Sequence, residues 1–281
     1  MNDPLVSTAW LADRLGSNEV RIVDASWFMP GEGRTGRQSY DRGHIPGAVF
    51  FDIDGVADHH TDLPHMLPAP DAFAEAAGAL GLRRDLITVV YDAQGIFSAP
   101  RVWWTLRIMG FPEVFVLDGG LPKWRAEGRP LEIAAAHPQA ATLEPAFDPS
   151  LVRDLDEVRS ALNRREAQVV DARAAARFRG EAPEPRAGLR AGHMPGAHNV
   201  PWGGLVAADG TMKTAQDLKA AFQGAGVDLD APIVTSCGSG VSAALLALAL
   251  ARLGREDVAV YDGSWTEWGG RADTPAVTGA A

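Results

Sequence analysis

The sequence predicts an α/β protein made of two similar domains in tandem, each with a parallel β-sheet flanked by helices. Three observations lead to this fold class. The 281 residues are enough for about two domains. Short apolar runs alternate with helical patterns in both halves, which is typical of βαβ units and parallel sheets. Several motifs of the first half also return in the second half in the same order.

The repeated motifs indicate duplication of a whole domain. They recur at a nearly constant distance along the chain, and this distance is too long for a solenoid repeat. A stretch with three prolines and few large apolar residues separates the two copies. We therefore expect an N-terminal domain over residues 1–135, a linker over 136–150 and a C-terminal domain over 151–281. The paired segments are 23–26 and 170–173 (VDAS, VDAR), 43–48 and 192–197 (GHIPGA, GHMPGA), 89–92 and 234–237 (VVYD, VTSC), and 117–120 and 261–264 (LDGG, YDGS).

The second half shows the alternation of strands and helices most clearly. The pattern predicts strands over residues 168–171, 233–236 and 258–261, and helices over 214–223 and 241–252. The predicted strands are short and lack polar alternation, as strands buried on both faces do. Thr214 followed by Asp217 resembles a capping box at a helix start.

Charge and composition exclude several kinds of partner. Lys and Arg number 26 against 36 Asp and Glu, so the net charge is −10 and the cationic field that nucleic acids or anionic membranes need is missing. The uncharged stretch 231–251 is long enough for a membrane span, but its first half is rich in Pro, Thr, Ser and Gly. We expect a buried strand, a tight loop and a buried helix there. We also expect a monomer, since no amphipathic stripe is left to pair.

Cys237, the only cysteine, is the candidate nucleophile. It follows a predicted strand and precedes a predicted helix, at the edge where parallel α/β sheets place their sites. Gly238 and Gly240 permit a tight loop whose backbone N–H groups point inward, and the helix adds the positive end of its dipole. Both effects should stabilise a thiolate. The alternative is a buried inert cysteine, but the first copy carries Asp92 at this place, so the fold does not require a thiol.

Other kinds of cysteine site fit the sequence poorly. A protein-tyrosine phosphatase needs an arginine six residues after the cysteine, where this chain has Ala243. A disulfide oxidoreductase needs a second thiol nearby, and a papain-like enzyme needs a different local signature. One cysteine also excludes an internal disulfide and a multi-cysteine metal centre. The N-terminal residues show no secretory signal, and a lone thiol suits a reducing compartment, so we expect a cytoplasmic protein.

A proline-containing loop in the second half concentrates arginines, among them Arg177 and Arg186. Two arginines on a rigid loop suit a bidentate clamp on a carboxylate or another small oxyanion. The alternative is a surface loop in which the arginines pair with Glu181 and Glu184.

Three polar side chains could handle protons near the thiol. An Asp, a His and a hydroxyl can form a relay, and Asp54, His65 and Ser239 offer these groups. The alternatives are a structural role for His65 and a helix-capping role for Ser239.

Together these motifs resemble the tandem-domain rhodanese sulfurtransferases over nearly the whole chain. The loop at residues 237–242 reads CGSGVS. It is similar to the CGSGVT of the branch that uses 3-mercaptopyruvate, and it lacks the two cations of CRKGVT in the thiosulfate branch. Ser242 replaces the threonine and keeps a hydroxyl. Further landmarks of the resemblance are residues 24–27, 51–54, 65–68, 91–92, 98–104, 118–120, 177–186, 192–197 and 262–265.

The resemblance implies a complete reaction. Cys237 would take sulfur from 3-mercaptopyruvate as a persulfide, releasing pyruvate, and pass it to a thiol such as thioredoxin, or to cyanide. Arg177 and Arg186 would hold the substrate, while Ser239, His65 and Asp54 would form the proton-handling triad, drawn from both halves. The first copy would be inactive, and no metal or organic cofactor is implied. The loop residues whose amides would cradle the persulfide are Gly238, Ser239, Gly240, Val241 and Ser242.

Two rival functions stay open at this point. The first is a thiosulfate sulfurtransferase on the same scaffold, against which the neutral loop argues. The second is a non-catalytic module that relays or senses sulfur through the persulfide, against which the intact cysteine loop and the arginines argue.

Overall fold

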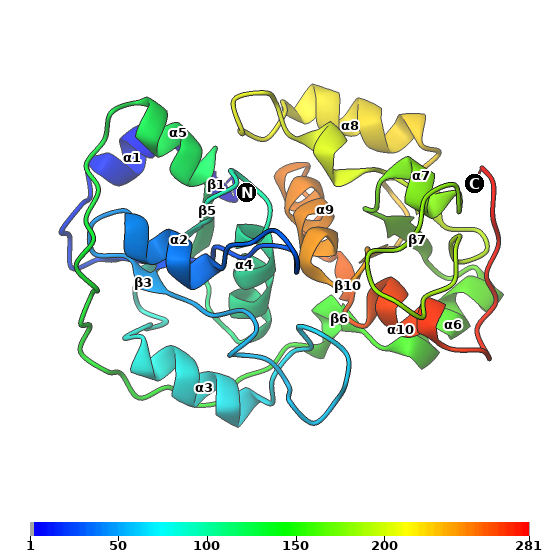
Figure 1. Ribbon diagram of the computed structural model, residues 1–281, viewed down its shortest axis with the longest axis horizontal. Helices are drawn as coiled ribbons and strands as arrows, with labels where there is room; N and C mark the ends of the chain where they lie inside the picture. Colours follow the sequence, from blue (N-terminus) through cyan, green and yellow to red (C-terminus); the bar gives the residue numbers. More distant parts are fainter. Residues whose placement is uncertain (1–2, 281) are drawn as a thin grey trace. The chain divides into compact units, whose positions relative to one another are not determined.

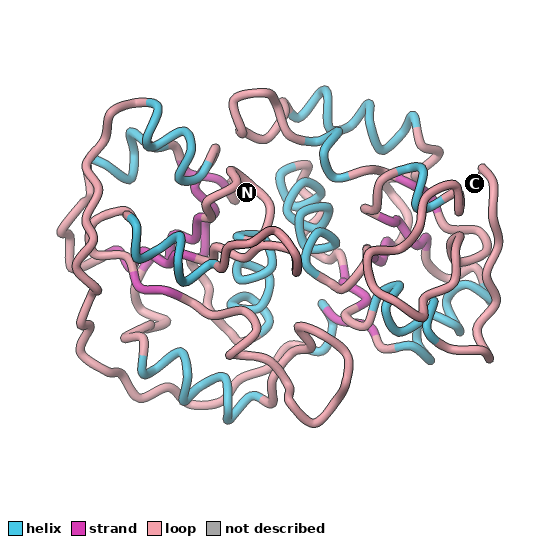
Figure 2. Tube along the Cα trace, in the orientation of Figure 1, coloured by secondary structure: helices cyan, strands magenta, loops and turns pink. Residues whose placement is uncertain are grey.

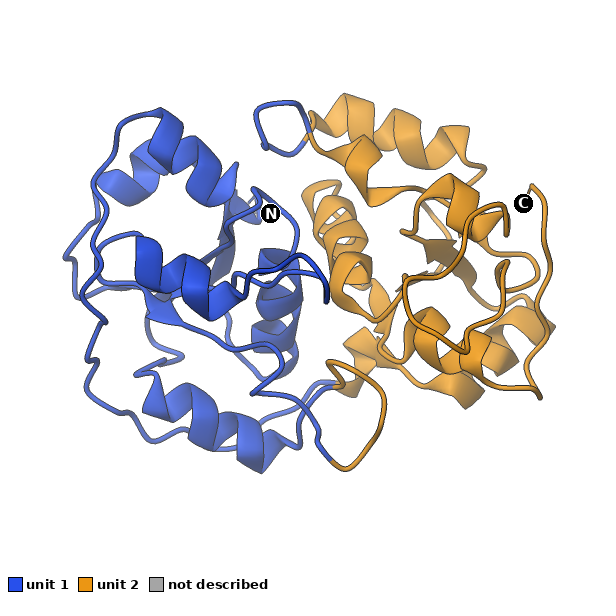
Figure 3. Cartoon of the chain, in the orientation of Figure 1, with its two compact units in different colours: residues 1–59, 67–148, 207–212 blue, residues 60–66, 149–206, 213–281 orange. Residues whose placement is uncertain are grey.

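Each half of the chain forms its own compact unit around a parallel sheet. The computed structural model describes residues 3–280. One unit comprises residues 1–59, 67–148 and 207–212, and the other comprises 60–66, 149–206 and 213–281 (Figure 3). Two short segments are thus assigned to the unit opposite to their place in the chain. The boundaries 1–135, 136–150 and 151–281 stay a prediction.

The first unit alternates strands and helices along the chain. Its sheet has the order β1-β5-β4-β2-β3, and neighbouring strands run parallel. Its elements are β1 (Leu5–Val6), α1 (Thr8–Ala12), β2 (Val20–Asp24), α2 (Gly36–Arg42), β3 (Val49–Phe50), α3 (Pro70–Ala79), β4 (Ile87–Tyr91), α4 (Ala99–Ile108), β5 (Val114–Leu117) and α5 (Gly120–Ala126).

The second unit repeats this order of elements. Its sheet, β6-β10-β9-β7-β8, is the counterpart of the first, again with parallel neighbours. Its elements are β6 (Val152–Arg153), α6 (Leu155–Arg164), β7 (Gln168–Asp171), α7 (Ala175–Phe178), β8 (His198–Asn199), α8 (Ala215–Gly224), β9 (Ile233–Ser236), α9 (Val241–Arg252), β10 (Ala259–Tyr261) and α10 (Ser264–Gly270), with 3₁₀ turns at Pro149–Leu151 and Trp202–Leu205. The predicted fold class is confirmed.

Helices cover both faces of each sheet (Figure 1). In the first unit, side chains of α1, α2 and α5 pack with β2 and β4 into one core cluster that includes Trp124. In the second unit, α6, α7 and α10 pack with β7, β9 and β10 into a cluster that includes Trp265 and Trp268. Strands covered on both faces need apolar side chains on both, which explains their unbroken apolar runs.

The helix α9 is the most deeply buried of the second unit. Ten of its residues are buried, from Val241 to Ala251. A helix that is apolar nearly all round belongs in a protein interior when it is too short to span a bilayer. Within residues 3–280, no helix has the length and the apolar character needed to cross a membrane.

Two long loops hold several of the predicted site residues. Figure 2 shows the loop-rich course of both units. Residues 51–69 contain no helix or strand, and neither do residues 180–192. These two loops hold Asp54, His65 and Arg186. Parallel sheets leave such loops free to vary because the core lies in the strands and helices.

Candidate functional site

Cys237 lies in a tight loop between a buried strand and a buried helix. It follows β9 directly, and α9 begins four residues later. The side chain is 2% exposed. The backbone N–H of Gly240 donates to its Sγ over 3.1 Å. Gly240 has a φ of 81°, which a glycine adopts without strain, and it forms the N-cap of α9. The loop therefore offers the sulfur an amide donor and the positive end of a helix, as predicted from the two glycines.

The start of α10 holds the backbone of this loop. The N–H of Trp265 donates to the carbonyl oxygen of Cys237 over 3.0 Å. The carbonyl of Gly238 accepts two bonds from Thr266, one from its N–H (2.8 Å) and one from its Oγ1 (2.6 Å). Because a trans peptide points its C=O and N–H in opposite directions, these bonds aim the N–H groups of Gly238 and Ser239 away from α10.

Ser264 completes this contact with the loop. Its Oγ accepts the N–H of Cys237 over 3.1 Å and donates to the carbonyl of Tyr261 over 2.9 Å. Ser264 is fully buried and has a φ of 50°. A non-glycine residue in this left-handed region is strained and persists only where its surroundings enforce it. Ser264 and Thr266 thus fix the orientation of the Cys237 loop.

Arg177 belongs to a buried network of charges beside the loop. Glu184, with a side chain 2% exposed, accepts from Arg177 Nη2 over 2.5 Å and from Arg173 Nη1 over 2.9 Å. Arg173 also forms an ion pair with Asp171 over 2.6 Å and stacks on the ring of Trp265. Burial opposes the charged form of Arg173, but Asp171 and Glu184 together raise its pKa. The two arginines and two carboxylates have no net charge, and a buried network needs this balance because an unpaired buried charge is destabilising.

Arg177 reaches from this network to the cysteine loop. A Cβ atom added to Gly238 would lie 3.1 Å from Arg177 Nη2. The guanidinium therefore lies directly over the residue that follows Cys237, and its side chain keeps 25% exposure. The alternative of an ion-paired loop also holds in part, since Arg177 pairs with Glu184 and Arg179 with Glu181. Pairing and substrate binding are compatible, because a guanidinium has five donors.

Arg186 and His65 meet in the second unit. Arg186 Nη2 lies 3.3 Å from His65 Nε2. Arginine can only donate, so Nε2 is the acceptor in this contact. His65 is buried and has a φ of 63°, an uncommon backbone for a histidine. The His65 ring is therefore positioned both by this backbone conformation and by the contact with Arg186.

The other predicted site residues are placed as follows. Ser239 is buried, and α9 begins without a side-chain cap, so the capping alternative for Ser239 is wrong. Val241 and Ser242 form the first turn of α9. Asp54 belongs to the first unit, where its Oδ2 accepts from Trp27 Nε1 over 2.8 Å. Among residues 3–280, no three His, Cys, Asp or Glu side chains gather as a metal-binding group.

The first unit shows what the same loop does without a thiol. Asp92 occupies the position after β4 and is fully buried. Its Oδ2 accepts the N–H groups of Phe97, Ser98 and Ala99 within 2.9 Å, and its Oδ1 accepts that of Gln94 over 2.8 Å. Three of these amides lie at the start of α4. The strand–loop–helix turn of this fold therefore binds an anion, here its own carboxylate.

The sequence did not reveal that Glu184 holds Arg173 and Arg177 together, and it gave no role to Ser264 and Thr266. A signal for Ser264 was present in the repeat, since its counterpart is Gly120. Gly120 has a φ of 54°, and the next amide, that of Leu121, donates to Asp92 O over 3.0 Å, as Trp265 does to Cys237. A glycine in one copy thus marks the left-handed turn in both.

Comparison with known proteins places the chain in a family. The model of the rhodanese-like domain matches residues 7–127 and again 154–271. The chain is 49% identical over 271 residues to a 3-mercaptopyruvate sulfurtransferase of Escherichia coli K12, covering 96% of each protein. It is 45% identical over 295 residues to the mitochondrial thiosulfate/3-mercaptopyruvate sulfurtransferase 1 of Arabidopsis thaliana, covering 98% of this chain and 78% of that protein.

A solved structure agrees with these matches. The crystal structure of SseA from Escherichia coli, described as a 3-mercaptopyruvate sulfotransferase with the rhodanese fold, aligns with a TM-score of 0.87 and 46% identity. The alignment covers 94% of this chain and 99% of that one. Two matched domains, high identity over nearly the full length and a shared fold show that this chain belongs to the rhodanese family of sulfurtransferases, with two rhodanese-like domains in tandem.

Proposed function

We propose that this protein transfers sulfur from 3-mercaptopyruvate to an acceptor through a persulfide on Cys237. The observation that carries the proposal is the loop CGSGVS at residues 237–242, with its amide donor to Sγ and its uncharged side chains. The relatives named for 3-mercaptopyruvate support the same donor. Arg177, over Gly238, supplies positive charge at the mouth of the loop for the substrate carboxylate.

The first half-reaction balances without a cofactor. The thiolate of Cys237 attacks the sulfur of 3-mercaptopyruvate, a sulfur–sulfur bond forms, and the carbon–sulfur bond breaks toward the enolate of pyruvate. The proton of the substrate thiol ends on the methyl carbon, which leaves pyruvate and a persulfide anion. We assign this proton movement to Ser239, His65 and Asp54, and the stabilisation of the persulfide anion to the amides of residues 238–242.

The second half-reaction returns the enzyme to its starting state. A thiol such as that of thioredoxin attacks the outer sulfur, takes it as its own persulfide and restores the Cys237 thiolate. Cyanide takes the same sulfur as thiocyanate. A cytoplasmic, monomeric enzyme with a reducing thiol partner and no metal or organic cofactor is part of the proposal.

Steady-state kinetics test the donor and the nucleophile. Pyruvate and thiocyanate release are measured with 3-mercaptopyruvate and cyanide, and thiocyanate release with thiosulfate and cyanide. We expect a higher kcat/KM with 3-mercaptopyruvate, and no turnover of either donor by Cys237→Ser, since an alcohol forms no persulfide. A preference for thiosulfate would favour the rival that the Arabidopsis relative's name includes. Turnover of neither donor by the folded parent would favour a relay or sensing role.

A further inference from the structure

Arg173 is a buried arginine of the second unit that binds several elements at once. It lies two residues after the end of β7, and 1% of its side chain is exposed. Its Nε and Nη2 donate to Oδ2 of Asp171 over 2.9 Å and 2.6 Å. Its Nη1 donates to Glu184 over 2.9 Å, and its Nη2 also donates to the carbonyl of Gly192 over 2.9 Å. One guanidinium thus joins the end of β7 to two points of the loop that contains Arg186.

The partners of Arg173 reach both parts of the candidate site. Glu184 also accepts from Arg177, the arginine that lies over the cysteine loop. On the other side, Cζ of Arg173 lies 4.4 Å from the ring centroid of Trp265, whose N–H donates to the carbonyl of Cys237 over 3.0 Å. Arg173 is therefore one residue removed from the arginine assigned to the substrate carboxylate and one residue removed from the backbone of the nucleophile.

The first unit shows that the fold does not require this arginine. The paired sequences VDAS and VDAR place Ser26 where the second unit has Arg173. The hydroxyl of Ser26 accepts the N–H of Ala93 over 3.0 Å. Asp24, the counterpart of Asp171, is fully buried, and burial raises the pKa of its carboxyl. The unit without the thiol thus keeps the buried aspartate but not the guanidinium, which links the arginine to the site rather than to the fold.

We propose that Arg173 is a positioning residue for sulfur transfer, which holds Arg177 and the Cys237 loop in a fixed arrangement. The inference rests on the function proposed for Cys237. The edge of the guanidinium fixes Glu184 and through it Arg177, and the face of the guanidinium packs on Trp265. Only a planar cation serves both contacts, because a lysine ammonium offers neither a fork for carboxylates nor a flat face for an indole ring.

The test compares two alkylating reagents, iodoacetate and iodoacetamide, on Cys237 of the full chain. They differ in a carboxylate against an amide, so the ratio of their rates reports the positive charge at the mouth of the loop without any turnover. We expect Arg177→Gln to lower this ratio roughly tenfold, the effect of one charge-assisted hydrogen bond. Arg173→Lys keeps the charge but loses the fork and the flat face, and we expect it to lower the ratio roughly threefold.

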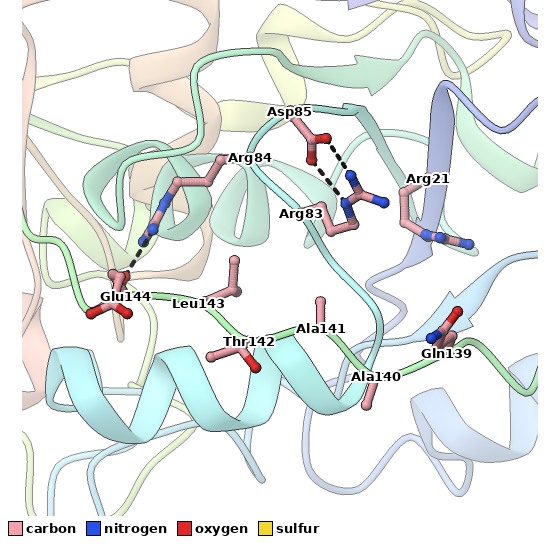
Figure 4. Close-up of a pocket in the computed structure, with 10 residues that line it drawn as sticks. All are labelled: Arg21, Arg83, Arg84, Asp85, Gln139, Ala140, Ala141, Thr142, Leu143 and Glu144. Carbon is pink, nitrogen blue, oxygen red and sulfur yellow. Dashed lines mark hydrogen bonds and ion pairs between the residues drawn. The ribbon is translucent and has the colours of Figure 1, made fainter.

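A double variant shows whether Arg173 acts through Arg177. In the Arg177→Gln background, Arg173→Lys should lower the ratio no further, because the group that it positions is already gone. The matched control is Arg83→Lys in the first unit. Arg83 also forms a forked pair with an aspartate two residues away, Asp85, but both side chains are exposed (Figure 4). This control should leave the ratio at the parent value.

Thermal unfolding shows which variants are folded. If Arg173→Lys is not, Asp171→Asn with Arg173→Gln takes its place, because it removes the buried pair without leaving either charge unpaired, and it should lower the ratio at least as much. An unchanged ratio in a folded variant, or an equal fall in the Arg177→Gln background, would overturn the proposal. The ratio needs no sulfur donor, so a parent that fails to turn over 3-mercaptopyruvate would overturn the proposed function alone.

Discussion

Replacing Thr266 by valine removes one hydrogen bond from the backbone that positions Cys237. The change deletes the 2.6 Å bond from Oγ1 to the carbonyl of Gly238 and keeps the shape of the side chain. The N–H of Thr266 still donates to that carbonyl over 2.8 Å, so the oxygen does not lose its last partner. The expected cost is that of one ordinary hydrogen bond, about 1 kcal/mol, or roughly a fivefold change in an equilibrium or rate constant.

Two measurements locate this loss. Thermal unfolding reports the stability of Thr266→Val. The orientation of the loop is reported by the rate at which iodoacetamide alkylates Cys237 and by kcat, both measured as a function of pH. We expect slower alkylation and a lower kcat, with an unchanged KM, because the arginines proposed to bind the substrate are untouched. Thr266→Ser keeps the hydroxyl and should stay close to the parent. If Thr266→Val matched the parent in alkylation, kcat and stability, the role assigned to α10 would be refuted.

Three further changes test other parts of the account. Asp92→Ala leaves four amides, three of them buried, without their acceptor. It should lower the free energy of unfolding by on the order of 3 kcal/mol or more in urea denaturation, and stability equal to the parent would contradict the anion cradle. The double change Gly238→Arg with Ser239→Lys adds two cations to the loop and brings a side chain against Arg177 Nη2. The kcat/KM for thiosulfate should therefore rise relative to that for 3-mercaptopyruvate. An unchanged ratio of the two values would show that loop charge does not select the donor. Burial raises the pKa of Glu267 above 4.5, so the native state holds this proton more tightly than the unfolded state, and stability falls as pH rises above about 4.5. Glu267→Gln should flatten this part of the profile, and an unaltered slope would rule out the assignment.

The fold could be predicted because local and global patterns agree in this chain. The segments 168–171, 233–236 and 241–252 form β7, β9 and α9 with the predicted limits. Their apolar runs end at glycine, proline or charged residues, so the pattern alone sets their length. The strands β1 and β6 have two residues each, too few for any periodicity, and only the sheet order reveals them. The helix α8 begins one residue later than predicted, after Thr214.

The capping box expected at Thr214 is wrong in one of its two bonds. The Oγ1 of Thr214 accepts the N–H of Asp217, as expected of an N-cap. The carboxylate of Asp217, however, accepts from the hydroxyl of Thr214 and not from its backbone N–H. An aspartate is one carbon shorter than the glutamate of a full capping box, so it does not reach back to that amide.

The candidate site could be predicted where a residue's chemistry is unusual for its place, as with Cys237 after a strand. Arg177 was expected in a loop, but it lies in the short helix α7, which the sequence pattern did not reveal. The site could not be predicted where a common residue acts through backbone geometry. Ser264 and Thr266 are ordinary in the sequence, and their role depends on a left-handed turn that brings α10 against the loop. Glu184 could be named only as a possible ion-pair partner, because its burial between two arginines is a tertiary feature. The role of Asp54 in proton transfer stays a prediction.

Mass spectrometry of the intact protein tests the central claim most directly. The protein is exposed briefly to 3-mercaptopyruvate, or separately to thiosulfate, and then to cyanide. The account predicts one added sulfur atom on Cys237 after 3-mercaptopyruvate, its removal by cyanide, and no addition to Cys237→Ser. An adduct that forms more readily from thiosulfate would contradict the assigned donor, and the absence of any adduct would contradict the persulfide itself.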